Sequence, residues 1–286
     1  MINMKIGIIG IGLIGGSIAI EVKKTIKNAY IIGYDSSQSN LDISIKLGLI
    51  DGVISKKDYK FLDVIFLAMP VKEISKQLPT ILDMINSKAL VIDFGSTKVN
   101  ICKSVSNHPK RKQFLATHPI AGTEFSGPSA SKEKLFYGKV QILCESKYTD
   151  SSHLNWATNW FKTIGMKIKE MSPKDHDKHI AYVSHLSHIS SIILGQTVLE
   201  KEKDESAIFA MAGSGFASTV RLAKSSPETW SSIFEENEKN ILETLTHYLI
   251  NLEKFKNLIE EKKYKNIHKV IENTNNIKDV LKGIKN

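Results

Sequence analysis

The first 170 or so residues alternate short apolar runs with segments of helical periodicity. Runs rich in Ile, Val and Leu, or otherwise strand-like, lie at 5–9, 30–34, 64–68, 90–93, 114–117, 140–144 and 167–171. The first four are almost continuously apolar, which is typical of parallel strands covered on both faces. Amphipathic helices are predicted at 14–24, 37–47, 72–85 and 156–164. This alternation predicts a doubly wound α/β sheet.

After Ser172-Pro173 the strand pattern disappears. Long segments with a period of 3.6 residues follow at 173–199, 205–212, 216–223, 227–263 and 267–284. In the fourth of these, apolar residues from Trp230 to Phe255 form one stripe, as on a helix that packs on a partner. We therefore expect two domains, an α/β domain at 1–172 and an all-α domain at 173–286.

Composition narrows the class of protein. The chain has 286 residues and a formal net charge of +9, but all of its 39 basic residues except Arg111 and Arg221 are lysines. Arginine is the residue suited to bidentate contacts with bases and phosphates, so we expect no nucleic acid partner. Cys102 and Cys144 are too few for a four-cysteine zinc site, and we expect no metal. No apolar run reaches the ~20 residues of a membrane span, so a cytoplasmic protein is expected.

The first strand ends in a glycine-rich turn. Gly10, Gly12 and Gly15 form a GxGxxG pattern immediately before a predicted helix, and Asp35 follows twenty residues later at the end of the second strand. In this setting the glycines allow a tight turn, close approach of a pyrophosphate and close packing of helix on strand. An acidic residue at the end of the second strand suits the ribose hydroxyls of NAD and repels the extra phosphate of NADP. The pattern predicts an NAD-binding domain of Rossmann type.

Two further strands end in polar residues, where ligands bind in open α/β sheets. Ser96 and Lys98 follow the strand at 90–93 and are expected to face the reactive end of the cofactor, although Ser96 could equally cap a helix. His118 follows the strand at 114–117 and precedes a loop rich in Gly, Pro and Ser. A histidine there could accept a hydroxyl proton while hydride leaves for NAD.

The helical part contributes candidate binding residues. His185 and His188 are three residues apart and share a helix face, which favours a pair that lines an anionic substrate pocket over a zinc site. Arg221 lies about one turn into the helix after the turn at 213–215. Its guanidinium could bind a carboxylate bidentately, with a surface salt bridge as the alternative.

Together these segments resemble the prephenate dehydrogenase family of tyrosine biosynthesis. The matching motifs are GxGLIGGS at 10–17, DxGSxK at 93–98, HPIAGxExSG at 118–127, HD at 176–177, SHLxH at 184–188 and GF…R at 215–221. The resemblance implies oxidative decarboxylation of prephenate by NAD to 4-hydroxyphenylpyruvate with release of CO2. It also implies a homodimer formed through the C-terminal helices.

The resemblance assigns roles to individual residues. His118 is expected to be the catalytic base, and Ser96 to lie near it and the ring hydroxyl. Cofactor binding is expected of Gly10, Gly12, Leu13, Ile14, Gly15, Asp35, Ala68, Pro70 and Ser96. Substrate binding is expected of Arg221, His185, His188, Glu124, Gly122 and Thr123, with Glu124 gating or ordering the pocket.

The chain departs from the family pattern at two places. Ala217 and Ser218 stand where the family often has Arg-Asp, and Ser187 replaces a usual proline, which bears on substrate preference and pocket rigidity. The nearest alternative is an arogenate dehydrogenase, or an enzyme that accepts both substrates. A β-hydroxyacid-type dehydrogenase would use a lysine base, with Lys174 and Lys178 as candidates. A regulator that kept the fold without catalysis is the alternative from a different class.

Overall fold

The computed structural model describes residues 4–203 and 207–282. Its centre is a single eight-stranded sheet with the strand order β3-β2-β1-β4-β5-β6-β7-β8. All neighbouring strands are parallel except β6 and β7, which are antiparallel. The strands are β1 (Lys5–Ile9), β2 (Tyr30–Tyr34), β3 (Gly52–Val53), β4 (Val64–Leu67), β5 (Leu90–Asp93), β6 (Phe114–Pro119), β7 (Val140–Cys144) and β8 (Lys167–Met171).

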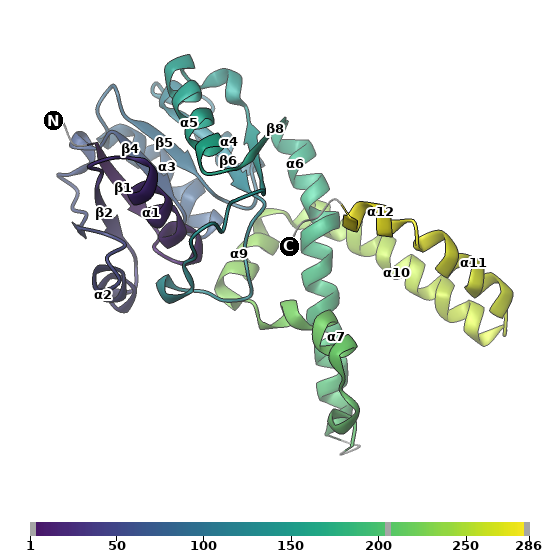
Figure 1. The fold of residues 1–286 in the computed structure, drawn as a ribbon. Helices are drawn as coiled ribbons and strands as arrows, with labels where there is room; N and C mark the ends of the chain where they lie inside the picture. Colours follow the sequence, from purple (N-terminus) through teal and green to yellow (C-terminus); the bar gives the residue numbers. More distant parts are fainter. Residues whose placement is uncertain (1–3, 204–206, 283–286) are drawn as a thin grey trace. The chain divides into compact units, whose positions relative to one another are not determined.

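Helices cover both faces of this sheet, so the predicted doubly wound α/β domain is confirmed (Figure 1). The helices of this part are α1 (Leu13–Thr25), α2 (Gln38–Lys46), α3 (Val71–Met84), α4 (Val99–Ser104) and α5 (Ser151–Thr163), with 3-10 turns η1 (Tyr59–Phe61), η2 (Arg111–Gln113), η3 (Pro128–Ala130) and η4 (Ser146–Tyr148). The two-residue strand β3 and the six-residue helix α4 were missed, because segments this short carry too few apolar positions to show a period.

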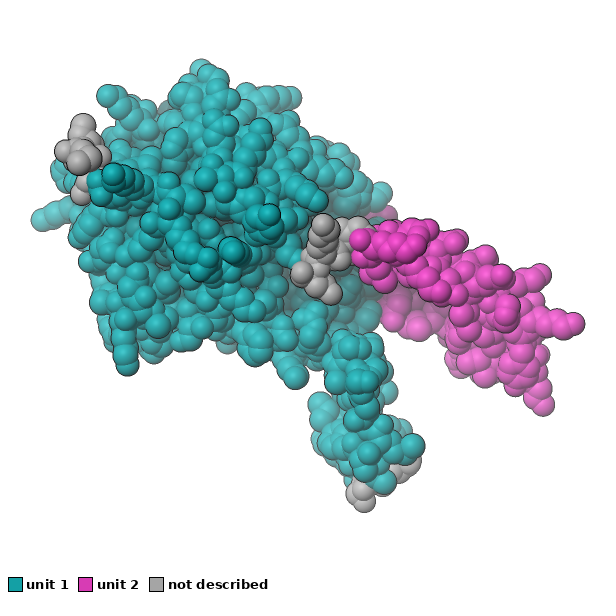
Figure 2. Space-filling model, in the orientation of Figure 1, with its two compact units in different colours: residues 1–238 teal, residues 239–286 magenta. Residues whose placement is uncertain are grey.

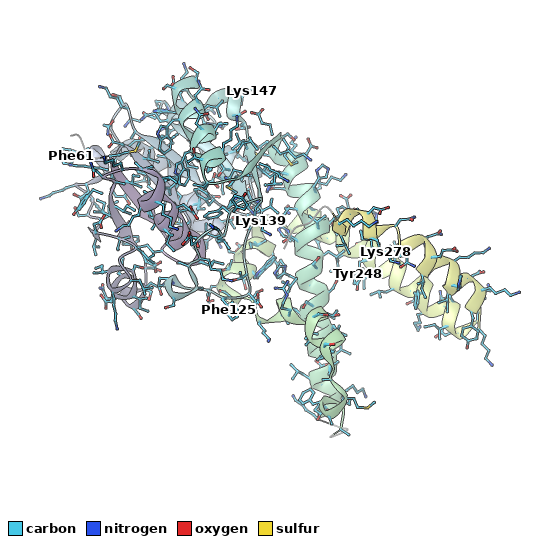
Figure 3. The ribbon with its side chains drawn as sticks, viewed as in Figure 1. Phe61, Phe125, Lys139, Lys147, Tyr248 and Lys278 are labelled. Carbon is cyan, nitrogen blue, oxygen red and sulfur yellow. The ribbon has the colours of Figure 1, made fainter. Side chains whose placement is uncertain are left out.

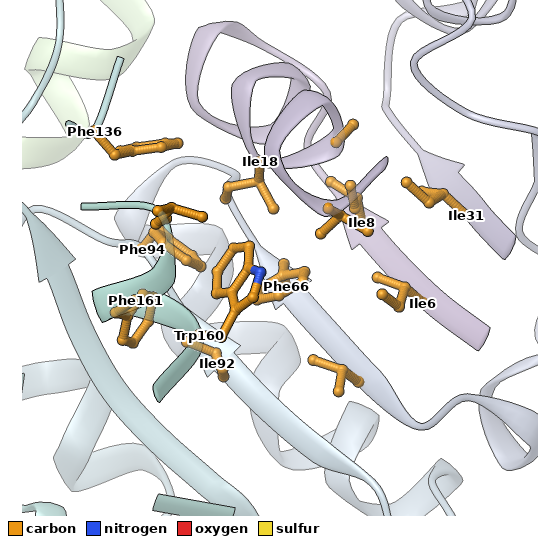
Figure 4. Close-up of a cluster of buried hydrophobic side chains, with 14 of the residues drawn as sticks. Ile6, Ile8, Ile18, Ile31, Phe66, Ile92, Phe94, Phe136, Trp160 and Phe161 are labelled. Atoms are coloured by element: carbon orange, nitrogen blue, oxygen red, sulfur yellow. The ribbon is translucent and has the colours of Figure 1, made fainter. Parts of the chain in front are cut away.

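The core consists of two apolar layers, one on each face of the sheet. On one face α1 and α5 pack over aromatic side chains, with Phe66 and Trp160 ring centroids 5.1 Å apart (Figure 4). On the other face α3 and α4 cover the alternate strand residues, such as Ile65 and Val91. Burial of both strand faces explains why the first strands read as continuous apolar runs.

A helical segment follows β8 and packs against the sheet domain. It comprises α6 (Pro173–Ile180), the π-helical turn η5 (Ala181–His185), α7 (Leu186–Glu202), η6 (Phe209–Met211), α8 (Ser214–Thr219), η7 (Arg221–Lys224) and α9 (Pro227–Glu236). The Lys72 amine at the start of α3 pairs with Glu235 of α9 at 2.7 Å. Residues 1–238 thus form one compact unit (Figure 2). The expected domain boundary at residue 172 stays a prediction.

The second compact unit begins at residue 239 (Figure 2). Its described residues, up to 282, form helices with many exposed apolar side chains. The last helices of the chain are α10 (Glu238–Glu260), α11 (Tyr264–Thr274) and α12 (Ile277–Lys282). Leu249 and Leu252 of α10 are 57% and 49% exposed. None of the helices in residues 4–203 and 207–282 is long and apolar enough to cross a membrane.

The helical predictions hold in type but not in continuity. The helix expected at 227–263 is interrupted at Asn237, whose backbone has φ −124° and ψ 25°. The segment at 205–212 contains only the short turn η6 within the described residues, and 204–206 lie outside them. The helix expected at 267–284 is divided between α11 and α12. At Asn237 no proline or glycine marks the break, and side-chain hydrogen bonds to other helices replace such a signal.

Candidate active site

The turn between β1 and α1 has the geometry that a bound nucleotide needs. Gly10 has φ +87°, and a Cβ on it would lie 2.6 Å from the main chain of Ala68 and of Met69. A Cβ on Gly15 would lie 2.0 Å from the carbonyl oxygen of Gly10. A Cβ on Gly12 would meet nothing within 4 Å. The fold itself therefore requires the outer two glycines, whereas the middle one leaves space for a ligand.

Helix α1 begins beside that space without a side-chain cap. Gly12 is its N-cap residue, and Leu13 and Ile14 are the first residues of the helix. The first N–H groups of a helix have no partner within the helix and carry its positive dipole end. Pro70, the N-cap residue of α3, comes three residues after the last residue of neighbouring β4. The space and the uncapped helix end together fit a dinucleotide pyrophosphate.

Asp35, which directly follows β2, is fixed by hydrogen bonds from the glycine-rich turn and from the start of α2. Its carboxylate accepts the main-chain N–H of Ile11 (2.8 Å) and of Ser37 (2.9 Å), and the side-chain amide of Asn40 (3.1 Å). A carboxylate has about four acceptor positions, so one remains for a ribose hydroxyl. Asp35 thus shapes the turn and is placed as an NAD-binding domain requires.

A buried ion pair at the end of β5 overturns one expectation. The Lys98 amine is fully buried, pairs with the carboxylate of Asp93 and donates to the carbonyl of Thr117 (2.6 Å). Asp93 also accepts the N–H of Thr117 (3.0 Å). Lys98 therefore ties the end of β5 to the end of β6 and does not face the cofactor. Ser96 is half-buried in the intervening turn and, within the described residues, forms no hydrogen bond with His118, so its expected role stays a prediction.

His118 is the first member of a chain of hydrogen bonds. Its Nδ1 lies 2.8 Å from Nε2 of His176, and Nδ1 of His176 lies 2.7 Å from Oδ1 of Asp177. Because a carboxylate accepts, His176 carries its proton on Nδ1 and accepts at Nε2. His118 must then donate from Nδ1. Nε2 of His118 then carries no proton, and its lone pair can accept one, as a general base requires.

Burial holds His118 in the neutral form. Removal from water lowers the pKa of His118 well below its ordinary value, and the charges of His176 and Lys98 act in the same direction. A neutral imidazole with its Nε2 lone pair free is ready to accept a proton at pH 7.

Asp177 joins several elements at the base of this chain. Its carboxylate accepts the main-chain N–H groups of Lys98 (2.7 Å) and Val99 (2.8 Å), at the start of α4. The carboxylate is 1% exposed. Because α4 and the sheet hold Asp177 and Asp177 holds His176, the orientation of His118 is set by rigid elements.

The π-helical turn η5 ends at His185, one turn before His188. Such turns insert an extra residue into a helix and are frequent at functional sites. His188 stacks on the indole of Trp230 with ring centroids 3.4 Å apart, and His185 meets the same indole edge-on at 5.9 Å. Burial lowers the pKa of His185 to about 4. Burial also lowers the pKa of His188, and the charge of Arg221 adds to that effect.

Arg221 connects the helical segment with the loop after β6. Its guanidinium binds the carboxylate of Glu124 at 3.0 Å, and the pair is partly exposed. Gly122 and Thr123 precede Glu124 in this loop, and Thr123 Oγ1 accepts the N–H of Phe125 (3.3 Å). The Phe125 side chain is 63% exposed (Figure 3). The predicted substrate residues are thus on one loop and on the helices that follow the sheet.

Several residues of the site carried no assigned role beforehand. His176, Asp177, Trp230 and Asn237 all contact a predicted site residue or its partner. The HD motif was visible, but the contact between His118 and His176 spans 58 residues and has no local pattern. Trp230 belongs to the apolar stripe of the predicted helix at 227–263, so the sequence pattern predicts only a packing role for it.

Other chemistries find less support in the structure. Lys174 and Lys178, the alternative lysine bases, are exposed residues of α6, whereas His176 and Asp177 of the same helix are buried. Across residues 4–203 and 207–282 there is no group of three or more His, Cys, Asp or Glu residues that could hold a metal ion.

Comparisons with known proteins agree with this geometry. The model of the prephenate dehydrogenase nucleotide-binding domain matches residues 18–170, and that of the prephenate dehydrogenase dimerization domain matches residues 172–273. Prephenate dehydrogenase of Bacillus subtilis is 30% identical over 95% of this chain and 74% of its own length. Cyclohexadienyl dehydrogenase of Zymomonas mobilis is 28% identical over 89% of this chain and 88% of its own.

Solved structures resemble the chain over nearly its whole length. Prephenate dehydrogenase from A. aeolicus, in complex with hydroxyphenyl propionate and NAD+, superposes with a TM-score of 0.87 at 28% identity, covering 98% of this chain and 99% of that one. Arogenate dehydrogenase of Synechocystis superposes with a TM-score of 0.77 at 29% identity, covering 97% and 100%. With both family domains matched and a relative 30% identical over most of its length, the chain belongs to the prephenate dehydrogenase family.

Proposed function

We propose that this protein is an NAD-dependent prephenate dehydrogenase. It converts prephenate to 4-hydroxyphenylpyruvate and CO2 in the biosynthesis of L-tyrosine. The observation that carries the proposal is the chain of contacts from Nδ1 of His118 through His176 to Asp177, which assigns proton acceptance to Nε2 of His118. His118 lies at the carboxyl end of β6, and this end shares an edge of the sheet with the glycine-rich turn.

NAD is the cofactor that the nucleotide-binding turn fits. The main chain from Gly10 to Gly15 binds the pyrophosphate at the start of α1, and Asp35 accepts a ribose hydroxyl. Ala68, Pro70 and Ser96, on the turns after β4 and β5, complete the site toward the nicotinamide. When bound, NAD supplies the acceptor for the hydride that leaves the hydroxyl-bearing ring carbon.

The residues of the chain handle the proton and the charges. His118 takes the proton of the ring hydroxyl at Nε2 as that carbon gives up its hydride. The resulting positive charge is stabilised through Nδ1, since His176 accepts there and is itself bonded to Asp177. The ring carboxylate departs as CO2, and its bonding electrons make the ring aromatic as a phenolate. The phenolate takes the proton back from His118, which restores the base.

Substrate recognition is assigned to the helices and the loop after β6. Arg221 exchanges Glu124 for a carboxylate of the substrate, and Glu124, with Gly122 and Thr123, orders the loop. His185 and His188 line the pocket beside Trp230. In this scheme residues 1–172 bind the cofactor, and residues 173–286 bind substrate and form a homodimer. The cytoplasmic location expected from the sequence stays a prediction.

Arogenate is the second candidate substrate, because relatives of comparable identity are named cyclohexadienyl and arogenate dehydrogenases. Arogenate carries an ammonium where prephenate has a keto group. The reacting ring is the same in both, so the role of His118 does not depend on this choice.

The test is NADH formation with prephenate and with arogenate, each with NAD and NADP. We expect the highest kcat/KM with prephenate and NAD. His118→Asn should lower the rate about 10²–10⁴-fold without weakening NAD binding, since it removes the base only. His179→Asn, the same change at an exposed position of α6, is the control and should keep full activity. If only arogenate is turned over, arogenate replaces prephenate as the assigned substrate. If the folded protein turns over neither compound, the proposal is refuted.

A further inference from the structure

Asn237 occupies the break between α9 and α10 and is almost completely buried, with 4% of its surface exposed. Its side-chain nitrogen lies 2.7 Å from the main-chain oxygen of Asp177 and 3.2 Å from Nδ1 of His185. It therefore links His185 to the residue that anchors the His118 chain. Asn237 itself lies in none of the motifs that carry the family resemblance, although its partners Asp177 and His185 do.

The carbonyl of Asp177 determines which way the amide points. A main-chain oxygen can only accept, so the group 2.7 Å from it must be the NH2 of Asn237. The same nitrogen has a second hydrogen, and this one meets Nδ1 of His185. Nδ1 must then be the acceptor, which leaves the proton of the neutral ring on Nε2.

In the part of the chain that the structure describes, no group accepts that proton from Nε2 of His185. Its side chain is fully buried, and Nε2 has no hydrogen-bond partner among the described residues. Buried polar atoms of native proteins are nearly always paired, so an unpaired donor calls for a partner from outside the chain. Nδ1 of His118 donates and its Nε2 accepts, whereas the roles of the two nitrogens are reversed in His185.

We propose that Asn237 is a positioning residue that fixes His185 as the neutral tautomer protonated at Nε2, so that His185 offers an uncharged donor to an oxygen of the substrate. This inference rests on the proposed function, because it takes His185 to line the substrate pocket. An uncharged donor suits a substrate whose carboxylate leaves as CO2. A cation paired with that carboxylate would stabilise the ground state more than the transition state.

The groups that face His185 allow this state to be maintained. Asp177 and His176 approach from α6, His188 lies on the following turn, and Trp230 packs from α9. The negative charge of Asp177 favours protonation of His185, but burial outweighs it. The hydrogen that Asn237 donates to Nδ1 opposes protonation at that atom, which is the one that a second proton would occupy.

The first test measures the tautomer directly. In protein labelled with ¹⁵N-histidine, long-range ¹H–¹⁵N spectra distinguish protonated from unprotonated ring nitrogens, and the signals of His185 are identified by their loss in His185→Gln. We expect Nε2 protonated and Nδ1 unprotonated in the wild type from about pH 8 to about pH 5, given a pKa of about 4. A wild-type ring protonated at Nδ1 would overturn the proposal. Because no substrate is present, this result is independent of the proposed activity.

Asn237→Asp should reverse the arrangement. A carboxylate cannot donate to Nδ1, so the ring proton should move to Nδ1 and the pKa of His185 should rise by about 1–3 units. Asn100→Asp is the matched control, since the Asn100 amide bonds Glu236 at the exposed end of α9 without touching His185. Unchanged His185 signals in Asn237→Asp would contradict the proposal.

A pair of His185 variants tests the donor even if Asn237→Asp fails to fold. Glutamine places an amide nitrogen near the position of Nε2, whereas asparagine places one near Nδ1. We expect His185→Asn to raise the KM of the ring substrate on the order of tenfold more than His185→Gln does, with the KM of NAD unchanged in both. Equal losses in the two variants would refute the donor role. A wild type that shows the tautomer but no turnover would refute the proposed function alone.

Discussion

The glycine-rich turn and the histidine network serve one reaction but are built from opposite materials. The turn depends on the absence of side chains, because a Cβ on Gly10 or Gly15 would collide with main chain. The network depends on buried side chains whose hydrogen bonds fix each other, from His118 through His176 to Asp177. A defect in the turn should therefore act on folding and cofactor binding. A defect in the network should act on the chemical step and leave NAD binding intact.

The largest separation of these effects is expected from Asp177→Asn. The NH2 group of the new amide would face the N–H groups of Lys98 and Val99, or the protonated Nδ1 of His176. Because two donors cannot bond each other, the hydrogen bonds that set the tautomers of His176 and His118 would be lost. We expect kcat to fall about 10²–10⁴-fold while NAD binding is retained. The free energy of unfolding should fall by about 1–3 kcal/mol.

Steady-state kinetics, NAD titration and urea unfolding measure the three effects of that substitution. Asp175→Asn is the matched control, since Asp175 is an exposed residue of the same helix whose hydrogen bonds with Ser172 lie at the helix start. Loss of NAD binding in Asp177→Asn would show that the two regions are not separable.

The next largest effect distinguishes two glycines of the turn. Gly15→Ala places a methyl group against the carbonyl oxygen of Gly10 and should destabilise the protein by at least about 1–3 kcal/mol. Gly12→Ala adds the same methyl group in open space, at φ −87°, and should leave the melting temperature unchanged. Its methyl group would occupy the space of the pyrophosphate, so the KM for NAD should rise about tenfold or more. Equal stability losses in the two variants would contradict this division.

The same contrast explains what could be predicted from the sequence. The strands bounding the turn, the helix after it and Asp35 are all close in sequence, and their apolar runs and glycine spacing are local signals. His118, Arg221 and Glu124 are candidate site residues because they lie in motifs, which are local signals too. Lys98 lies in a motif too, but its side chain points into the protein because its amine binds Asp93 and the carbonyl of Thr117 on the next strand.

Asn237 marks the limit of local patterns. The apolar period runs through it without interruption, and neither proline nor glycine ends the helix there. The break depends on hydrogen bonds to Asp177 and His185, which are 60 and 52 residues away. Residues that act by connecting distant helices leave no period, and only the folded chain reveals them.

The pH dependence of stability should come from the histidine network. Burial places the folded-state pKa of His185 at about 4, below the ordinary 6.5. Between these values the unfolded chain binds more protons, so this contribution to stability is present above about pH 6.5 and is lost as pH falls toward 4. From pH 7 to pH 5 the contribution of His185 to the free energy of unfolding should fall by roughly 2 kcal/mol. Urea unfolding at pH 7 and pH 5 should show a smaller loss of unfolding free energy in His185→Gln than in the wild type. An identical loss in the two proteins would assign the pH dependence to other groups.

The smallest effect on stability is expected at Arg221, whose partly exposed ion pair with Glu124 joins the helical segment to the loop after β6. Arg221→Lys keeps the charge, and because water and salt screen the pair with Glu124, the melting temperature should not change. A lysine cannot bind a carboxylate bidentately, so the KM of the ring substrate should rise on the order of tenfold while the KM of NAD stays constant. Glu124→Gln is the companion variant, because it leaves the guanidinium without its ion-pair partner and should lower that KM if Glu124 competes with substrate. If both variants left the KM of the ring substrate unchanged, Arg221 would be a surface residue and the carboxylate would be bound elsewhere.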